Sequence, residues 1–210
     1  FRDGTFAVND VFDNQIEFYS STGTHLQTVN LAAGVSPGGS TIDSNNTLWV
    51  GGFNGQLLRF HQSGTLLTTL PVPGVQFAGV AYSATDHTLW VTQRDGNKVT
   101  HLSQSGTILG SFTVPVPVGG VEEFDAISVA ADGTLYVAGS GSTSILHVST
   151  TGVSLGSIPI VNPDYPFYMT IAPPPAAPTP ALQAGDVIFS NLGIAGLIGR
   201  TGAGANVEWH

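Results

Sequence analysis

The sequence predicts an all-β protein in which one unit of four short antiparallel strands recurs five times. The first observation is a glycine that recurs at intervals of 41, 42, 46 and 50 residues, at Gly23, Gly64, Gly106, Gly152 and Gly202. The second is an apolar side chain four residues before each glycine, at Tyr19, Phe60, Leu102, Val148 and Ile198. The third is the even spacing of short strand-like segments between Gly- and Asn-containing turns.

Each unit is expected to contain four strands. The innermost strand is centred near Ile42, Val80, Ile127 and Ile171. The second strand covers residues 5–8, 47–50, 88–91, 134–137 and 186–189. The third strand precedes the recurring glycine, and the fourth follows it over residues 25–31, 66–72, 108–114 and 153–160. Four strands in about 40–45 residues is the size of one β-propeller blade. A blade cannot bury its faces alone, so we expect five blades packed in a ring.

The predicted domain is a single propeller with blades over residues 1–34, 35–74, 75–120, 121–162 and 163–210. Two of the five units depart from the pattern. Residues 3–8 align with residues 132–137, so the first blade is expected to lack its innermost strand. In the fifth unit, the Pro-rich residues 172–185 cannot join a strand ladder and are expected to form a surface loop. The fourth strand of that unit is expected within residues 205–210.

Residues 38–70 resemble the NHL-type β-propeller repeat. The matching features are an inner strand, an acidic or Asn-containing turn at Asp43–Asn46, and the strand Leu48-Trp49-Val50. A further strand ends in Ser63-Gly64. The resemblance covers nearly all of the chain and implies the propeller fold. NHL-like propellers include protein- and RNA-binding modules, lyases and structural domains, so the resemblance leaves the function open.

Composition excludes several classes of partner. The net charge is −9, and the five basic residues are scattered along the chain. No basic patch is available for nucleic acid or for an anionic membrane. Charged residues make up 9% of the chain, against roughly 25% in an average domain. That composition favours an extracellular or cell-surface protein. Because the chain begins at Phe1, we expect that a leader has been removed or that the chain belongs to a longer one.

Three sets of side chains could carry chemistry. Trp49, Trp90 and Tyr136 occupy one equivalent strand position, which favours packing between blades over a carbohydrate-stacking track. His101 and His147 are also equivalent to one another, on neighbouring blades that are too far apart for one metal ion. The acidic residues Glu122, Glu123 and Asp125 are hard oxygen ligands suited to Ca²⁺. No other blade supplies a matching cluster, so we expect a solvated acidic loop, no metal site and no cofactor.

The leading functional hypothesis is a non-enzymatic, extracellular structural propeller that self-assembles into a filament or surface layer. Residues 34–38 and 152–156 match the G-x-S-x-G pattern, but no helix is expected after either of them, so no catalytic residues are assigned. The alternative is a glycan- or peptide-binding module that uses loop aromatics at the channel mouth, at Phe77, Phe124, Tyr165 and Phe167. A third hypothesis is a metal-dependent lyase or lactonase, which would need ligands from several blades.

The missing inner strand suggests how copies could assemble. Unpaired backbone groups at the centre of the ring would cost about 1–3 kcal/mol each. The segment around Asn206, Val207, Glu208 and Trp209 alternates apolar and polar residues after a flexible Gly-Ala-Gly sequence. If this strand enters another copy, the contact is head-to-tail and grows a ring or a filament. We therefore assign these four residues to a self-assembly interface.

Overall fold

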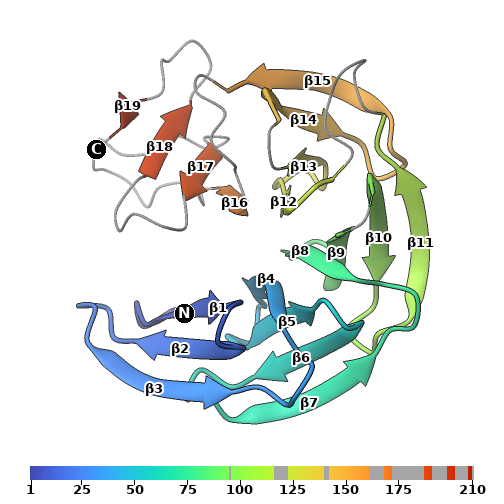
Figure 1. Ribbon diagram of the computed structural model, residues 1–210. Coiled ribbons are helices and arrows are strands. Elements are labelled where there is room, and N and C mark those ends of the chain that lie inside the picture. Colours follow the sequence, from blue (N-terminus) through green and yellow to red (C-terminus); the bar gives the residue numbers. More distant parts are fainter. Residues whose placement is uncertain are drawn as a thin grey trace.

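The structure, a computed structural model, describes residues 1–94, 96–115, 123–139, 142–160, 168–171, 187–190, 198–201 and 208–209. In these residues the regular structure consists of strands, arranged as five antiparallel sheets around a common centre (Figure 1). One sheet has three strands and four have four. The all-β propeller with a three-stranded first blade is therefore confirmed. None of the described residues forms a helix long and apolar enough to cross a membrane.

The strands follow one another from the centre to the rim of each blade. Blade 1 contains β1 (Phe6–Asp10), β2 (Gln15–Tyr19) and β3 (His25–Asn30). Blade 2 contains β4 (Pro37–Ile42), β5 (Leu48–Gly52), β6 (Gln56–Phe60) and β7 (Leu66–Pro71). Blade 3 contains β8 (Phe77–Ser83), β9 (Thr88–Gln93), β10 (Lys98–Leu102) and β11 (Ile108–Thr113). Blade 4 contains β12 (Ala126–Val129), β13 (Leu135–Ala138), β14 (Ser144–Val148) and β15 (Ser154–Pro159). Blade 5 contains β16 (Tyr168–Ile171), β17 (Val187–Ser190), β18 (Ile198–Thr201) and β19 (Glu208–Trp209).

The recurring glycines in blades 1 to 4 close the turn between the third and fourth strands. Their φ angles lie between 77° and 83°, at Gly23, Gly64, Gly106 and Gly152. L-residues with a side chain rarely adopt this left-handed conformation, which explains why glycine recurs there. The regular recurrence of glycine in the sequence therefore reflects a backbone conformation that each of these turns requires.

Apolar side chains from neighbouring blades form the core. One cluster joins Ile16 and Phe18 of blade 1 to Leu48 and Phe60 of blade 2. Equivalent clusters lie between blades 2 and 3, between blades 3 and 4, and between blade 4 and Met169 of blade 5. Trp49 and Trp90 are buried in two of them, which confirms their packing between blades.

The inner strands of blades 2 and 3 approach each other backbone to backbone. A Cβ atom on Gly39 would lie 2.7 Å from the Cα atom of Gly79, and one on Gly38 would lie 2.4 Å from the Phe77 carbonyl oxygen. Real Cβ atoms do not come that close to backbone atoms, so both positions require glycine. The contact leaves no room for functional side chains here.

The fourth strand of blades 1 to 4 carries a one-residue bulge. In blade 3, His101 pairs with Gly110 and Leu102 pairs with Ile108, which leaves Leu109 as the extra residue. The equivalent bulged residues in the other blades are Leu26, Leu67 and Leu155. A bulge disrupts the hydrogen-bonding edge of a sheet and hinders pairing with a strand from outside. These four rims are therefore poor sites for strand addition.

Candidate functional site: the open face of the first blade

The first blade packs one face against blade 2. Its other face has no covering blade among the described residues (Figure 1). Phe6 occupies the position of Leu48, Leu89 and Leu135, which are 0–2% exposed between blades. Phe6 itself is 42% exposed. Its ring stacks on Tyr19 with centroids 5.2 Å apart and planes 12° apart. Tyr19 in turn matches the buried residues Phe60, Leu102 and Val148.

The turn glycines give independent evidence for the uncovered face. A Cβ atom on Gly64 would meet Gln27 and Val29 of blade 1. Those on Gly106 and Gly152 would also meet the outer part of the preceding blade, at Leu70 and Phe112 respectively. In blade 1, a Cβ atom on Gly23 has no described atom within 4 Å. The surface that receives a preceding blade is thus present in blade 1 but has no partner in the described structure.

Polar side chains border the aromatic pair on this face. The Glu17 carboxylate lies 2.5 Å from His25 Nε2 and accepts a hydrogen bond of 2.8 Å from the Thr28 hydroxyl. The His25 ring meets Tyr19 edge-on, with centroids 5.4 Å apart. We call the surface formed by Phe6, Val8, Glu17, Tyr19 and His25 the open face. It combines exposed aromatic area with one paired carboxylate.

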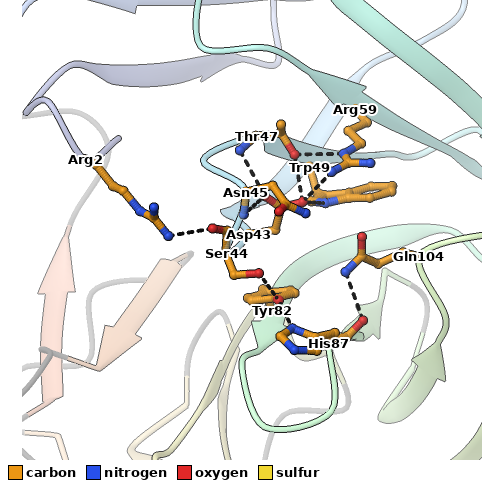
Figure 2. A network of polar contacts seen from close by, with 10 residues as sticks. All are labelled: Arg2, Asp43, Ser44, Asn45, Thr47, Trp49, Arg59, Tyr82, His87 and Gln104. Carbon is orange, nitrogen blue, oxygen red and sulfur yellow. Dashed lines mark hydrogen bonds and ion pairs between the residues drawn. The ribbon is translucent and has the colours of Figure 1, made fainter.

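A second set of side chains forms a polar network in blade 2 (Figure 2). The Asp43 side chain is fully buried and accepts hydrogen bonds from Trp49 Nε1 at 3.0 Å and from Arg59 at 2.9 Å. The Thr47 hydroxyl donates a third, at 2.7 Å. Burial opposes ionisation of Asp43. The bonds from Thr47 and Trp49 and the charge of Arg59 outweigh it and hold the pKa of Asp43 below its ordinary value. The Asp43 carboxylate is thus bonded to groups of the protein itself, and the network links the turn at residues 43–47 to the strands β5 and β6.

Blades 3 and 4 repeat this network with histidine in place of arginine. The His101 ring stacks on Trp90 with centroids 4.0 Å and planes 2° apart, and His147 stacks on Tyr136 at 4.4 Å and 3°. His101 Nε2 lies 2.7 Å from the Thr88 hydroxyl, and His147 Nε2 lies 2.8 Å from that of Thr134. Each histidine is thus committed to contacts within its own blade.

Arg2 and Tyr82 connect the networks to their surroundings (Figure 2). The Arg2 guanidinium donates to the Ser44 carbonyl oxygen at 2.5 Å, which fixes the start of the chain to blade 2. The Tyr82 hydroxyl lies 2.8 Å from the Ser44 hydroxyl and 2.5 Å from His87 Nδ1. These contacts fasten the turns of neighbouring blades together.

The acidic and aromatic candidates from the sequence have different outcomes. Glu122 lies outside the described residues, Glu123 is exposed and Asp125 is half-buried. No group of three metal-ligating side chains occurs in the described part of the chain. Phe77 and Phe124 are 0% and 2% exposed in clusters between blades, so their prediction as loop residues for a ligand is wrong. Tyr165 and Phe167 lie outside the described residues.

The predicted C-terminal interface is described only in part. Glu208 and Trp209 form β19, which pairs with β18 through Arg200 and Gly199 and so completes the fifth blade. Asn206 and Val207 lie outside the described residues. Strand exchange would require β19 to leave its own blade, and the assignment of these residues to an interface stays a prediction. The open face of blade 1 gave no sequence signal of its own, because only structure shows which repeat lacks a neighbour.

Solved structures similar to this chain are β-propellers. The chain is similar to virginiamycin B lyase from Staphylococcus aureus, with 20% identity and a TM-score of 0.65 over 98% of this chain and 66% of the lyase. It is also similar to Myxococcus xanthus glutaminyl cyclase, with 16% identity and a TM-score of 0.65 over 88% of this chain and 80% of the cyclase. The WD40 propeller domain of Doa1 matches at 13% identity, with a TM-score of 0.61 over 90% of this chain and 58% of that chain.

These likenesses define the class of protein as a β-propeller and carry no more than the fold. The chain spans about two thirds of the length of the lyases it matches. No protein-family model matches the sequence, and no curated protein matches it.

Proposed function

We propose that this chain is a non-enzymatic structural propeller with NHL-like repeats that associates with other copies of itself through the open face of blade 1. One observation carries the proposal. Phe6 and Tyr19 are accessible at positions whose equivalents in blades 2 to 4 are buried against a preceding blade. An extracellular location remains a prediction from the composition.

The proposed occupant is a blade of a second copy. In blades 2 to 4 the equivalent surface is covered by a blade of the same repeat, so a blade from another copy supplies a surface of the same general shape. The contact would be heterologous, with the open face of one copy against a different surface of the next. Such contacts grow into a ring or an open filament. Glu17 is already paired with His25, which lowers the cost of burying its charge.

The placement of the histidines supports a non-enzymatic role. The H270A variant of virginiamycin B lyase, one of the similar structures, is catalytically inactive, so that enzyme depends on a histidine. In the described part of this chain, His101 and His147 belong to the stacked networks. His25, His61 and His87 lie in or beside the turns that close strand pairs. None of these five shares a group of metal-ligating side chains.

Light scattering after size-exclusion chromatography over a range of concentrations tests the proposal. We expect the wild-type protein to associate and Phe6→Asp to shift it toward the monomer. Phe12→Asp is the matched control, because Phe12 is 93% exposed but lies outside the open face. Deletion of residues 203–210 separates this surface from strand exchange, which alone requires the C-terminal strand.

Two results would contradict the proposal. A wild-type protein that stays monomeric at high concentration would remove self-association. If the protein is a monomer and Phe6→Asp lowers its melting temperature while Phe12→Asp does not, the open face is covered within one molecule instead.

A further inference from the structure

A groove of about 610 Å³ lies between blades 2 and 3, away from the open face. Its walls are the hairpin residues 53–56, the connection 71–76 and Gln93 at the end of β9. The volume falls within the roughly 300–1,000 Å³ of ordinary ligand sites. No residue of the inner strands β4 and β8 and no residue of the polar networks lines this groove. Its function therefore has to be argued separately.

Backbone hydrogen bonds within the walls make the groove a preformed site. The Val72 amide donates to the Gly55 carbonyl oxygen at 2.8 Å, and the Arg94 amide donates to that of Gln76 at 3.0 Å. Pro71 and Pro73 restrict the connecting loop further. The Arg94 guanidinium lies over the Phe53 ring, 4.5 Å from its centroid, and holds this aromatic side chain in the wall. A ligand would therefore meet a site that needs little ordering.

The polar groups in the walls are carboxamides. Asn54, Gln56, Gln76 and Gln93 line the groove, and no charged side chain is among its lining residues. The side-chain amides of Gln56 and Gln76 make no hydrogen bond to any described residue. Each carboxamide offers a carbonyl acceptor and an NH₂ donor, so it can bind a hydroxyl group in either direction. This chemistry suits a neutral ligand rich in hydroxyl groups.

We propose that this groove binds a short neutral oligosaccharide. The amides of Gln56 and Gln76 would contact sugar hydroxyls, while Pro71, Pro73 and the part of Phe53 that Arg94 leaves uncovered supply the apolar surface for the sugar ring. A peptide fits less well. Extended peptides gain affinity from strand addition or from deep apolar pockets, whereas this groove is lined mainly by loop residues and only by the end residues Gln56, Pro71 and Gln93 of strands. The site is independent of self-association through blade 1.

Binding of neutral tri- and tetrasaccharides of glucose, galactose, mannose and N-acetylglucosamine to the full chain tests the proposal. Saturation-transfer NMR would find binding, and calorimetry would measure it. We expect at least one saccharide to bind, and the double variant Gln56→Ala/Gln76→Ala to weaken it about tenfold or more, because two hydrogen bonds are lost. Gln27→Ala is the control, since Gln27 is exposed on blade 1.

The proposal fails if none of these saccharides binds, or if the double variant binds as tightly as the wild type while its melting temperature is unchanged. A panel of short neutral peptides runs in parallel. Peptide binding that the double variant abolishes, without saccharide binding, would reassign the groove to peptides and overturn the proposal.

Discussion

Blades 2 and 3 contain the same network of an acid, a threonine, a tryptophan and a residue that covers the indole ring. The covering residue is Arg59 in blade 2 and His101 in blade 3. In blade 2 the acid is Asp43, whose side chain is 0% exposed and pairs with Arg59 at 2.9 Å. In blade 3 the acid is Asp86, whose side chain is 48% exposed and lies 3.6 Å from His101. The reason lies in the turns. Asp43 starts its turn, where its backbone amide bonds to Thr47, whereas Asp86 comes two residues before Thr88.

The difference shows that the repeat conserves a geometry and not a set of charges. In both blades an indole is covered by a cationic or imidazole group from the next strand, by Arg59 at 5.0 Å and by His101 at 4.0 Å. Only in blade 2 does the indole Nε1 donate to the acid. Blade 2 should therefore depend on a buried ion pair, and blade 3 on ring stacking with a group that titrates.

The largest expected effect comes from removing the indoles. Trp49→Ala should destabilise the protein by about 3–5 kcal/mol, since a large buried aromatic leaves a cavity. Trp90→Ala should cost a similar amount. Urea unfolding measures both, with the exposed Phe12→Ala as the control. If the urea unfolding curves of both variants match that of the wild type, the indoles do not hold neighbouring blades together.

Asp43→Asn should come next, at about 3 kcal/mol. The amide keeps an acceptor for Trp49, but it leaves the Arg59 guanidinium, which is 25% exposed, without its counter-charge. Removing one partner of a buried pair commonly costs about 3–5 kcal/mol, and the partial exposure of Arg59 places this case at the lower end. The double variant Asp43→Asn/Arg59→Met is the control and should recover part of the loss. A cost below about 1 kcal/mol would show that blade 2 does not depend on the pair.

Much of this architecture can be predicted from the repeat alone. Gly23, Gly64, Gly106 and Gly152 mark a backbone conformation, so their spacing gives the blades directly. Burial of Trp49 follows from its repeated position. The roles of Phe77 and Phe124 could not be predicted, because both lie next to connecting loops in sequence yet point into clusters between blades. The open face and the groove depend on which segments lie side by side, and sequence spacing does not contain that information.

The pH dependence of stability should also distinguish blade 3 from blade 2, with a smaller effect on the free energy of unfolding than the substitutions above. Burial lowers the pKa of His101, and the opposing charge of Asp86 does not restore it. As pH falls through the ordinary histidine value of about 6.5, the unfolded chain binds a proton before the folded chain does. Stability should therefore fall toward acid pH. His101→Phe, which copies Phe18 of blade 1, should reduce this slope in melts between pH 7.5 and 5. An identical slope in the variant would exclude His101 as its source.

Asp86→Asn should have the smallest effect on stability, below about 1 kcal/mol at neutral pH. The Asp86 side chain is half exposed, and His101 is largely neutral there, so little charge attraction is lost. The Asp86 carboxylate also accepts a 2.7 Å hydrogen bond from the Thr88 hydroxyl, and the amide oxygen of Asn can still accept it. The sensitive readout is the titration of His101 followed by NMR. Asp86 is the group that raises the pKa of His101 against burial. The substitution should therefore move that midpoint to lower pH, while Asp132→Asn in blade 4 should leave it in place. A midpoint that does not move would mean that the 3.6 Å contact carries no electrostatic coupling, and blades 2 and 3 would then differ more sharply than their distances indicate.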